Sequence, residues 1–462
     1  MPSSPPSSSS PSPSSSFTPP SSILIVGSGV FGLSTARSLA TRPSFSSTSI
    51  TVIDRSPFPA PDGSSIDTSR IIRSDYADPA YAALAAAAQE EWRKQGPDEL
   101  GGLGRYSETG LALVANNDSS GVPYVHASYE NILSLNKGTP NEGSVHEFTS
   151  PEAIARAVNC GGGTGNWGYL NTRSGWADAE ASMIWLRKKV DATKRVTFLT
   201  ATVTSLIFSA DPSSPSVRGV NLQDGQNQTA DLVILATGAW TPSLINLNGR
   251  CQATGQVLSY FPISDSEQER LRKMPVLLNM STGMFIITPA NNMVKVARHG
   301  YGYSNPTSMA NPEPNPTSGQ ETISISLPYT ALDIPNLHIP PEGEQACRQA
   351  LRSIIPWLGD RPFTQTKICW YADTPSGDFV FTYHPTYDNL FLATGGSGHG
   401  FKFLPVIGDK IVDCVEGNTP VGFREKWAWR KRTVEKVVTE DGSRGGRPGM
   451  VLVEEMGKGH KL

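Results

Sequence analysis

The sequence predicts an α/β protein in which a parallel-sheet domain, discontinuous along the chain, is interrupted by an antiparallel-sheet domain. Three short apolar runs each end in a glycine turn, at Gly27, Gly238 and Gly395. Such runs are typical of strands buried on both faces, and their wide separation indicates that distant segments build one sheet. Residues 251–330 instead alternate apolar and polar side chains between turns, which favours an antiparallel sheet.

The first predicted element is a strand that leads into a glycine-rich turn. Ile23–Val26 is apolar, and Gly27, Gly29 and Gly32 follow it with G-x-G-x-x-G spacing, ahead of a helical pattern. Gly27 permits a tight turn, Gly29 lets a pyrophosphate approach the backbone, and Gly32 allows the helix to pack closely on the strand. The N-terminus of that helix would offer unpaired N–H groups to phosphates.

A second strand and an acidic residue complete this unit. Ile50–Ile53 is apolar and mostly β-branched, and Asp54 follows it. An acid at this position can accept hydrogen bonds from ribose hydroxyls, and its charge would repel a 2′-phosphate. The alternative is a glycine-rich turn that binds no nucleotide. The order strand, glycines, helix, strand and acid favours a Rossmann-type dinucleotide site.

The remaining elements follow from apolar periodicity and turn residues. Residues 117–170 look loop-rich, with one helix near Pro151–Val158. The other predicted helices are Pro79–Lys94, Ala179–Val190, Gly343–Ile355 and Pro405–Glu416. The other predicted strands lie in Tyr106–Asn116, Arg195–Ala210, Asp231–Leu235, Lys367–Trp370, Phe379–Tyr383 and Asn389–Thr394.

These elements predict a division of the chain into domains. Residues 1–20 are almost all Ser and Pro, so we expect a disordered tail. We assign residues 21–105, 170–250 and 363–418 to the nucleotide-binding domain and residues 106–169 and 251–362 to a substrate domain. Residues 419–462 are a charged C-terminal extension, which we expect to wrap the surface or to be loose.

Composition excludes several classes of protein. The net charge of -3 in 462 residues gives no basic face for a nucleic acid. No apolar run approaches the roughly 18 residues of a membrane span, and the N-terminus does not resemble a secretory signal. The five cysteines are an odd number and widely spread, which argues against a disulfide framework and against a metal site, and for a reducing compartment.

At this point the motifs resemble those of the flavin-dependent amine oxidases of the sarcosine oxidase, pipecolate/saccharopine oxidase and fructosyl-amino-acid oxidase group. The resemblance runs from Ser22 to about Gly417. Five segments carry it: Ile23–Gly32 with Asp54, Thr68–Arg73, Ser174–Asp178, Lys367–Pro375 and Ala393–Pro405. It implies a discontinuous Rossmann-type FAD-binding domain, like those of glutathione reductase and D-amino-acid oxidase, with an inserted antiparallel-sheet substrate domain.

The resemblance also implies which residues bind FAD. Cys369 would carry the flavin through a thioether to its 8α-methyl carbon, because a thiolate near a cation is a good nucleophile. The alternative is an ordinary buried strand cysteine. The predicted cofactor-binding residues are Gly27, Gly29, Val30, Phe31, Gly32, Asp54, Ser69, Arg70, Val203, Cys369, Gly398, Gly400, Phe401 and Lys402.

Two predicted catalytic residues share one strand. Strand alternation places Lys295 and His299 on one face of the sheet. In similar enzymes a lysine at the matching place lies over the flavin and attracts superoxide as O2 accepts an electron, and a histidine lies four residues on. The alternative for Lys295 is a solvated lysine. The family tyrosine in this hairpin is replaced, with Ile286 nearest to it, which disfavours a substrate as small as sarcosine.

Two further predicted catalytic residues, Arg73 and Lys402, resemble the pair that holds a substrate carboxylate in sarcosine and pipecolate-type oxidases. An arginine suits a planar carboxylate because it can donate two parallel hydrogen bonds. Arg70 and Arg73 together favour a substrate that resembles a free amino acid. Surface solvation is the alternative for the arginines. For His399, a role in the turn and a role in the site both stay open.

The resemblance implies oxidation of the C–N bond of a secondary amine or N-substituted amino acid, of the saccharopine, pipecolate or sarcosine kind. Hydride would pass to flavin N5, and O2 would reoxidise the flavin to give H2O2 and an imine. Three alternatives stay open. They are a secondary-metabolite tailoring oxidase of an N-alkyl amino acid or peptide-like amine, a deglycating fructosyl amino acid oxidase, and a non-catalytic flavoprotein.

The expected partners are the small-molecule substrate and O2, in a monomer. His460–Leu462 resembles a peroxisomal address of the Ser-Lys-Leu type. A peroxisomal import receptor is therefore a possible partner, and the expected location is peroxisomal or cytoplasmic. The alternative is a chance sequence of three residues.

Overall fold

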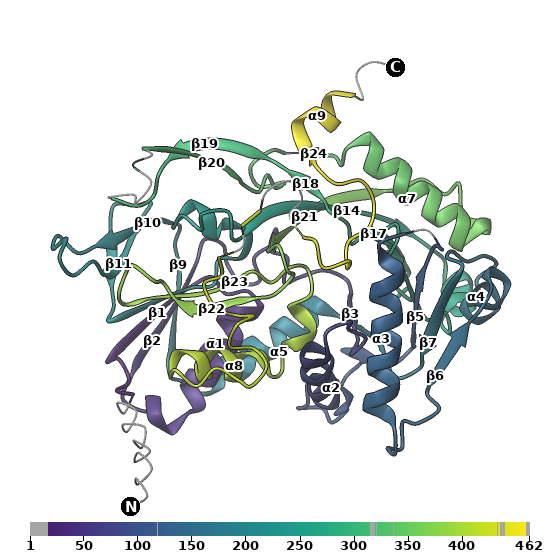
Figure 1. Ribbon diagram of the computed structural model, residues 1–462, viewed down its shortest axis with the longest axis horizontal. Coiled ribbons are helices and arrows are strands. Elements are labelled where there is room, and N and C mark those ends of the chain that lie inside the picture. The colour runs from purple at the N-terminus through teal and green to yellow at the C-terminus, as the bar shows by residue number, and fades with distance from the viewer. Residues whose placement is uncertain are drawn as a thin grey trace, which may run out of the picture.

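The computed structural model describes residues 17–117, 119–314, 319, 321–335, 337–431, 433–434 and 439–458. The predicted tail up to residue 16 and the tripeptide 460–462 lie outside the described residues. Two large sheets organise the fold, and helices cover their outer faces (Figure 1).

The first sheet joins the strands that were predicted to end in glycine turns. Its described strands follow the order β22-β23-β13-β1-β2-β9, and all neighbours are parallel except β22 and β23. The bounds are β1 (Ser22–Val26), β2 (Ser49–Asp54), β9 (Val196–Thr200), β13 (Leu232–Leu235), β22 (Val380–Tyr383) and β23 (Leu390–Thr394). Segments far apart in sequence therefore build one sheet, as predicted.

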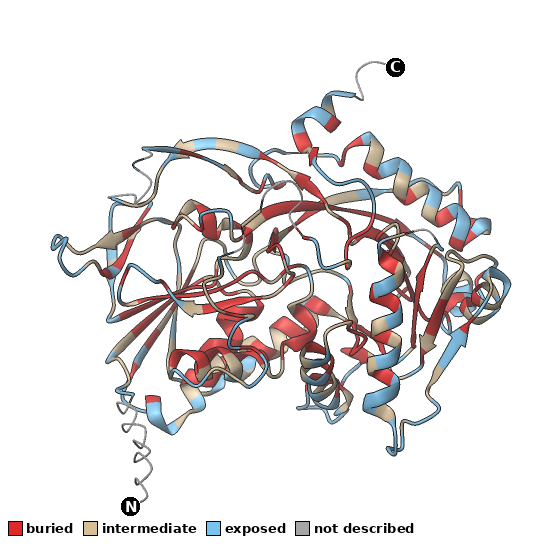
Figure 2. Ribbon diagram, viewed as in Figure 1, coloured by how far each residue is buried: buried red, intermediate tan, exposed pale blue. Residues whose placement is uncertain are grey.

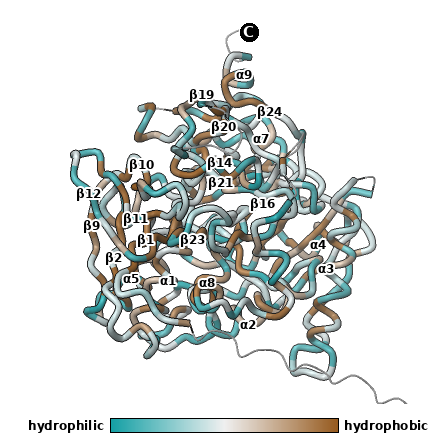
Figure 3. Tube along the Cα trace, turned by 60° about the vertical axis from the view of Figure 1, so that its left-hand side comes forward, coloured by the Kyte–Doolittle hydropathy of each residue, from teal (hydrophilic) through white to brown (hydrophobic). Residues whose placement is uncertain are grey.

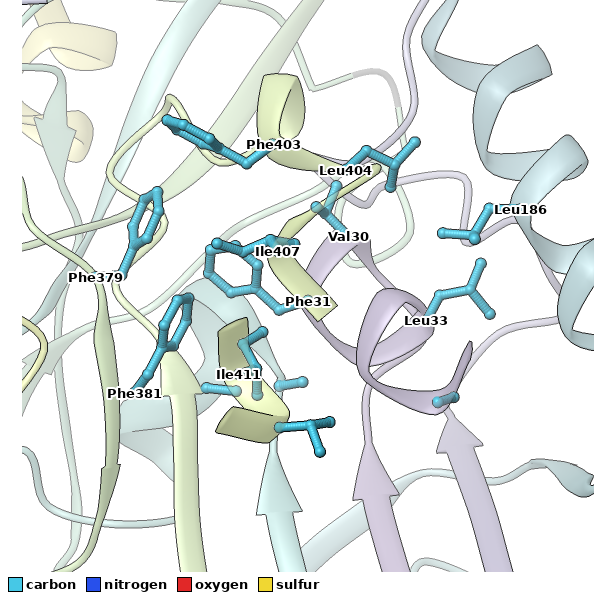
Figure 4. Close-up of a cluster of buried hydrophobic side chains, with 14 of the residues drawn as sticks. Val30, Phe31, Leu33, Leu186, Phe379, Phe381, Phe403, Leu404, Ile407 and Ile411 are labelled. Carbon is cyan, nitrogen blue, oxygen red and sulfur yellow. The ribbon is translucent and has the colours of Figure 1, made fainter. Parts of the chain in front are cut away.

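Both faces of this sheet are covered, which explains why its strands are apolar throughout. One face packs against α1 (Val30–Thr41), α5 (Ala179–Ala192) and α8 (Ile407–Val415). Figure 4 shows this core, where Phe31 of α1 lies beside Phe379, Phe381 and Ile411. The other face packs against an antiparallel meander of β10 (Val203–Phe208), β11 (Val217–Leu222) and β12 (Asn227–Thr229). Burial is dense along these strands and the inner sides of α1 and α8 (Figure 2).

The second sheet is mostly antiparallel, as residues 251–330 predicted. Its described strands follow the order β24-β18-β14-β17-β16-β15-β5-β7-β6, and β21 also pairs with β14. The bounds are β5 (Leu111–Ala115), β6 (Val145–Phe148), β7 (Trp167–Asn171), β14 (Gln252–Pro262), β15 (Val276–Asn279), β16 (Met284–Ile286), β17 (Met293–Arg298), β18 (Tyr303–Ser304), β21 (Gln365–Asp373) and β24 (Met450–Val451). Strand β14 is central, because its residues Gln256 and Tyr260 pair with Cys369 of β21 and Lys295 of β17.

Helices cover this second sheet too. One face packs against α4 (Pro151–Val158) and α7 (Pro341–Ile354), and the other packs against α3 (Gly121–Asn136). The chain is brown, hence hydrophobic, along the packed strands near β1 and β11, and paler or teal along many outer loops (Figure 3). The smaller elements are β3 (Arg70–Ile72), β4 (Tyr106–Ser107), β8 (Gly175–Ala177), β19 (Pro306–Ala310), β20 (Thr322–Ser326), α2 (Pro79–Arg93), α6 (Asp265–Leu271) and α9 (Leu452–Gly457).

No helix among the described residues is both long and apolar enough to cross a membrane. Over the same residues, no group of three or more His, Cys, Asp or Glu side chains could hold a metal ion.

The prediction of a loop-rich stretch at residues 117–170 is wrong. Helix α3 fills part of it and packs against β5 and β7 through Tyr124, Val125 and Ile132. Glycine and proline near its start, and the buried Ser128 in its middle, concealed the helical pattern. The predicted strand Tyr106–Asn116 is also interrupted, since β4 and β5 are separate strands.

The prediction of a loose or surface-wrapping C-terminal extension is also wrong for part of its length. Trp427 is fully buried and stacks on Phe423, with ring centroids 4.1 Å apart. Arg444 is 1% exposed. Strand β24 pairs in parallel with β18, so this segment belongs to the second sheet. Phe17, within the predicted tail, packs against Phe45 with centroids 6.0 Å apart.

Candidate active site and cofactor site

A cavity of about 1200 Å³ lies at the carboxyl ends of the first sheet's strands. Gly27, Gly29, Asp54 and Val203 line it, as predicted for a nucleotide site. Gly27 has φ +103°, and a Cβ there would lie 2.5 Å from the carbonyl oxygen of Ala236. The cavity therefore depends on glycine at the first turn.

The approach of α1 to this cavity also requires glycine. A Cβ on Gly32 would lie 1.9 Å from the carbonyl oxygen of Gly27. Neither Gly32 nor the side chains of Val30 and Phe31 line the cavity. The Phe31 ring packs instead against Phe381, with centroids 4.9 Å apart. The predicted role of these three residues therefore rests on the backbone at the helix N-terminus.

Asp54 is held in place by a residue that the sequence analysis did not name. The backbone N–H and the hydroxyl of Ser28 both donate to Asp54 Oδ2, at 2.7 Å each. Asp54 Oδ1 has only a long contact of 3.5 Å with the Ser56 N–H among the described residues. One oxygen of the carboxylate can therefore accept ribose hydroxyls while the other fixes its orientation.

A second cavity of about 650 Å³ lies between the two sheets. It brings together residues that are far apart in the sequence. Most of the remaining predicted site residues line it: Ser69, Arg70, Arg73, Lys295, His299, Cys369, Gly398, Phe401 and Lys402. Gly400 does not, and a Cβ there would lie 3.0 Å from the Phe31 ring.

One end of this inner cavity holds Cys369 and Lys295. Cys369 Sγ lies 3.7 Å from Arg70 Nη2. Lys295 is 3% exposed, so the alternative of a solvated lysine is wrong. Lys295 Nζ donates to Asp67 Oδ2 at 2.6 Å and to the carbonyl oxygen of Ser69 at 2.8 Å. Asp67 was not among the predicted site residues, since its contact with Lys295 joins positions remote in sequence.

The other end holds the predicted carboxylate pair. Arg73 is 4% exposed, so its surface alternative is also wrong. Its guanidinium lies 4.7 Å from the centroid of the Tyr76 ring, and Nη2 lies 3.5 Å from Tyr124 Oη. Lys402 Nζ donates to Tyr76 Oη at 3.0 Å and to the carbonyl oxygen of His399 at 2.9 Å.

The two basic side chains at this end lack a directly paired carboxylate. In the described part of the chain, neither Arg73 nor Lys402 forms an ion pair, and Arg73 Nη1 is buried without a hydrogen-bond partner. Asp75 contributes negative charge near Arg73. Burial lowers the pKa of Lys402 well below its usual value, and the charge of Arg73 lowers it further. A carboxylate bound between them would favour the charged form of Lys402 and could accept hydrogen bonds from both side chains.

A residue of the C-terminal extension, Arg444, contacts the lining residue His299 from behind the cavity wall. Arg444 Nη2 donates to Asp373 Oδ1 at 2.6 Å and to the carbonyl oxygen of Ser397 at 2.8 Å. Its Nη1 lies 2.8 and 2.9 Å from the two ring nitrogens of His299. Burial and the charge of Arg444 lower the pKa of His299 well below its usual value. His299 is therefore a neutral imidazole at neutral pH.

Two other candidates can now be located. His399 Nδ1 lies 2.9 Å from Tyr76 Oη, and its Nε2 lies 2.7 Å from the carbonyl oxygen of Gly377, so its ring is fixed on the cavity wall. Ile286 faces the opposite side of the sheet. Phe285 and Ile287 line the cavity where the replaced tyrosine was expected.

Residues 22–414 match the family DAO, described as FAD dependent oxidoreductase. The chain belongs to this family, which confirms the predicted class, an FAD-dependent oxidoreductase. The glycine-lined outer cavity suits the adenosine and pyrophosphate parts of such a cofactor, and the inner cavity beside Cys369 would hold its flavin ring.

Three similar proteins cover nearly the whole chain. The amino acid oxidase imqH of Aspergillus flavus is 34% identical over 85% of this chain and 92% of its own length. L-saccharopine oxidase of Schizosaccharomyces pombe is 29% identical over 88% of this chain and 93% of its own. The solved structure of fructosamine oxidase (Amadoriase II) from Aspergillus fumigatus has a TM-score of 0.75 at 28% identity, over 94% of this chain and 95% of its own.

Proposed function

We propose that the chain oxidises the C–N bond of an amino acid that carries a secondary amine. The observation that carries this proposal is the pair Arg73 and Lys402, buried without a direct carboxylate partner among the described residues, in the cavity that Cys369 also lines. Bound FAD would supply the hydride acceptor and the electrons for O2, with an imine and H2O2 as products. Relatives named amino acid oxidase and L-saccharopine oxidase support the same reaction class.

The chain's own residues would bind and orient the substrate. Arg73 can donate two hydrogen bonds to a carboxylate, while Lys402 contributes a second positive charge. Tyr76 holds both cations, because Arg73 stacks on its ring and Lys402 donates to its hydroxyl. Hydride loss from carbon requires a neutral amine. The cations around the cavity disfavour a protonated amine there, and neutral His299 can accept its proton.

Cys369 would hold the cofactor covalently. Its Sγ lies on the cavity wall, and the positive charge of Arg70 lies 3.7 Å away. A nearby cation stabilises the thiolate that such a linkage requires. Lys295, at the same end, would meet O2 and stabilise negative charge that develops on it.

The lining of the inner cavity bears on the substrate. Ile71, Leu258, Leu278 and Ile287 are apolar, and aromatic side chains add to them. A tailoring oxidase of a bulky N-alkyl amino acid is the second candidate, and these apolar residues favour it over a small substrate such as sarcosine.

Two finer proposals follow from the sequence. Peroxisomal import through His460–Leu462 would suit an enzyme that forms H2O2. The monomeric state is a proposal that size-exclusion chromatography with light scattering can test.

The test is anaerobic bleaching of the visible absorbance of the oxidised flavin. The panel contains sarcosine, L-pipecolate, L-saccharopine, N-methyl aromatic amino acids and fructosyl-lysine. We expect bleaching by an N-substituted amino acid, and recovery in air with H2O2 formed. The decarboxylated amine of the same compound is the matched control, and equal bleaching by it would contradict the role of Arg73 and Lys402. A flavin that no amine reduces would favour a non-catalytic flavoprotein.

A further inference from the structure

A single buried carboxylate joins the two cations at the Cys369 end of the inner cavity. The Asp67 side chain is 4% exposed. Its Oδ2 accepts a hydrogen bond from Lys295 Nζ at 2.6 Å and another from Arg70 Nη1. Its Oδ1 accepts from Tyr260 Oη at 2.8 Å and from the Thr68 N–H at 2.7 Å. This network fixes Asp67 from four directions.

We infer that Asp67 is a positioning residue that keeps Lys295 charged and aims its ammonium into the inner cavity for the reaction with O2. The inference rests on the proposed oxidase function and adds a residue to it. Asp67 itself acts through Lys295.

The charge of Lys295 depends on how burial and the neighbouring charges act on its pKa. Burial lowers the pKa of Lys295 to about 8, and the nearby charge of Arg70 also lowers it. Asp67 is the strongest opposing influence, and Cys369 adds a weaker one in the same direction. Burial would raise the pKa of Asp67, but Lys295 and Arg70 hold it far below its usual range, with a smaller effect from Lys367. Asp67 is therefore a carboxylate at any working pH, and Lys295 depends on it to remain an ammonium near neutrality.

The direction of the Lys295 ammonium follows from its hydrogen bonds. An ammonium has three N–H donors. Asp67 Oδ2 and the carbonyl oxygen of Ser69 take two of those on Lys295. In the part of the chain that the structure describes, the third is left for the cavity that Lys295 lines. Without the carboxylate, a buried amine beside Arg70 would turn away from that cation or lose its proton.

The decisive variant is Asp67→Asn, which keeps the shape and removes the charge. The rate at which the reduced holoenzyme reacts with O2 is measured by stopped flow between about pH 6 and 10, a range that spans the pKa of Lys295 at about 8. The wild-type rate should fall as pH rises through that value, because the ammonium is lost. In the variant this fall should move to lower pH by about one unit or more, which lowers the rate at the wild-type midpoint about fivefold or more. Anaerobic reduction by substrate should change far less.

A second readout needs neither substrate nor O2. Formaldehyde with cyanoborohydride methylates only neutral amines and is small enough to enter the cavity. The methylated fraction of the Lys295 peptide, measured by mass spectrometry against pH in the holoenzyme, gives the pKa of Lys295 directly. It should be lower in Asp67→Asn than in the wild type. Because this readout is independent of turnover, it stays decisive if the oxidase proposal itself fails.

Three further variants complete the design. Asp67→Glu restores the negative charge and should return the pH profile most of the way to that of the wild type. Glu267→Gln is the control. It removes the partner of Arg361, which does not line the inner cavity, and should leave the profile unchanged. If Asp67→Asn does not fold, Tyr260→Phe replaces it. Without the hydrogen bond from the Tyr260 hydroxyl, the negative charge of Asp67 interacts more strongly with Lys295. The pKa of Lys295 should therefore rise. An unchanged profile and unchanged labelling in the folded variants would overturn the inference.

Discussion

Replacing Arg73 with methionine should weaken catalysis and stabilise the fold at once. Methionine keeps an unbranched stem against the Tyr76 ring and removes the guanidinium. In the described chain Arg73 is buried with no ion pair, and its Nη1 has no hydrogen-bond partner. A buried polar group without a partner costs about 1–3 kcal/mol. Relieving that cost should raise the free energy of unfolding by about 1–2 kcal/mol in the substrate-free enzyme.

The same change removes the hydrogen bonds to the substrate carboxylate. Two charge-assisted bonds are worth about 3–4 kcal/mol together, so kcat/KM should fall by roughly 10²–10³-fold. Arg73→Lys keeps the positive charge but lacks the two parallel donors. Its kcat/KM should therefore lie between the values of the wild type and of Arg73→Met. Stability is measured by urea unfolding of the holoenzyme, followed by flavin and tryptophan fluorescence, and kcat/KM by H2O2 formation. A variant that is less stable and equally active would refute the reasoning.

Three other changes have expected outcomes. Cys369→Ser should give enzyme whose flavin separates from acid-precipitated protein, whereas the wild-type pellet should stay yellow; a colourless wild-type pellet would contradict the linkage. Gly32→Ala should lose flavin binding and stability together, because its Cβ would lie 1.9 Å from the carbonyl oxygen of Gly27; normal flavin content would show that α1 can shift. The double variant Asp373→Asn/Arg444→Met removes a buried ion pair as a unit, and it should raise the pKa of His299, which Arg444 holds down. Because protonated His299 cannot accept a proton, the acidic fall of kcat/KM should then move to higher pH, and a profile that does not move would remove His299 from the reaction.

The first βαβ unit could be predicted closely from sequence because its signals are local. β1, α1 and β2 lie within a residue or so of the predicted strands and glycine turn. Burial on both faces makes such strands apolar without interruption. Helix α3 lacks such a signal, since packing on β5 and β7 rather than its own periodicity selects its conformation.

The site could be predicted where the resemblance supplied residues, and not where remote partners decide the chemistry. Arg73, Lys295 and Lys402 converge on one cavity as their motifs indicated, although their roles stay predictions. Asp67 and Arg444 were missed because their buried partners across the fold are remote in sequence, although Asp67 also pairs with the nearby Arg70. Each is defined by a contact across the fold, with Lys295 and with Asp373.

Strand β14 sets the spacing between Cys369 and Lys295. Its residue Gln256 is paired with Cys369 on one side and its residue Tyr260 with Lys295 on the other. The register of one strand therefore fixes the spacing between Cys369 and Lys295, the residues proposed to hold the flavin and to meet O2. A deletion of one residue between Gln256 and Tyr260 would turn the side chain of either Gln256 or Tyr260 to the opposite face of the sheet. Loops around the cavity can change length and so change the substrate, whereas a change in the length of this strand would alter the spacing of the two residues.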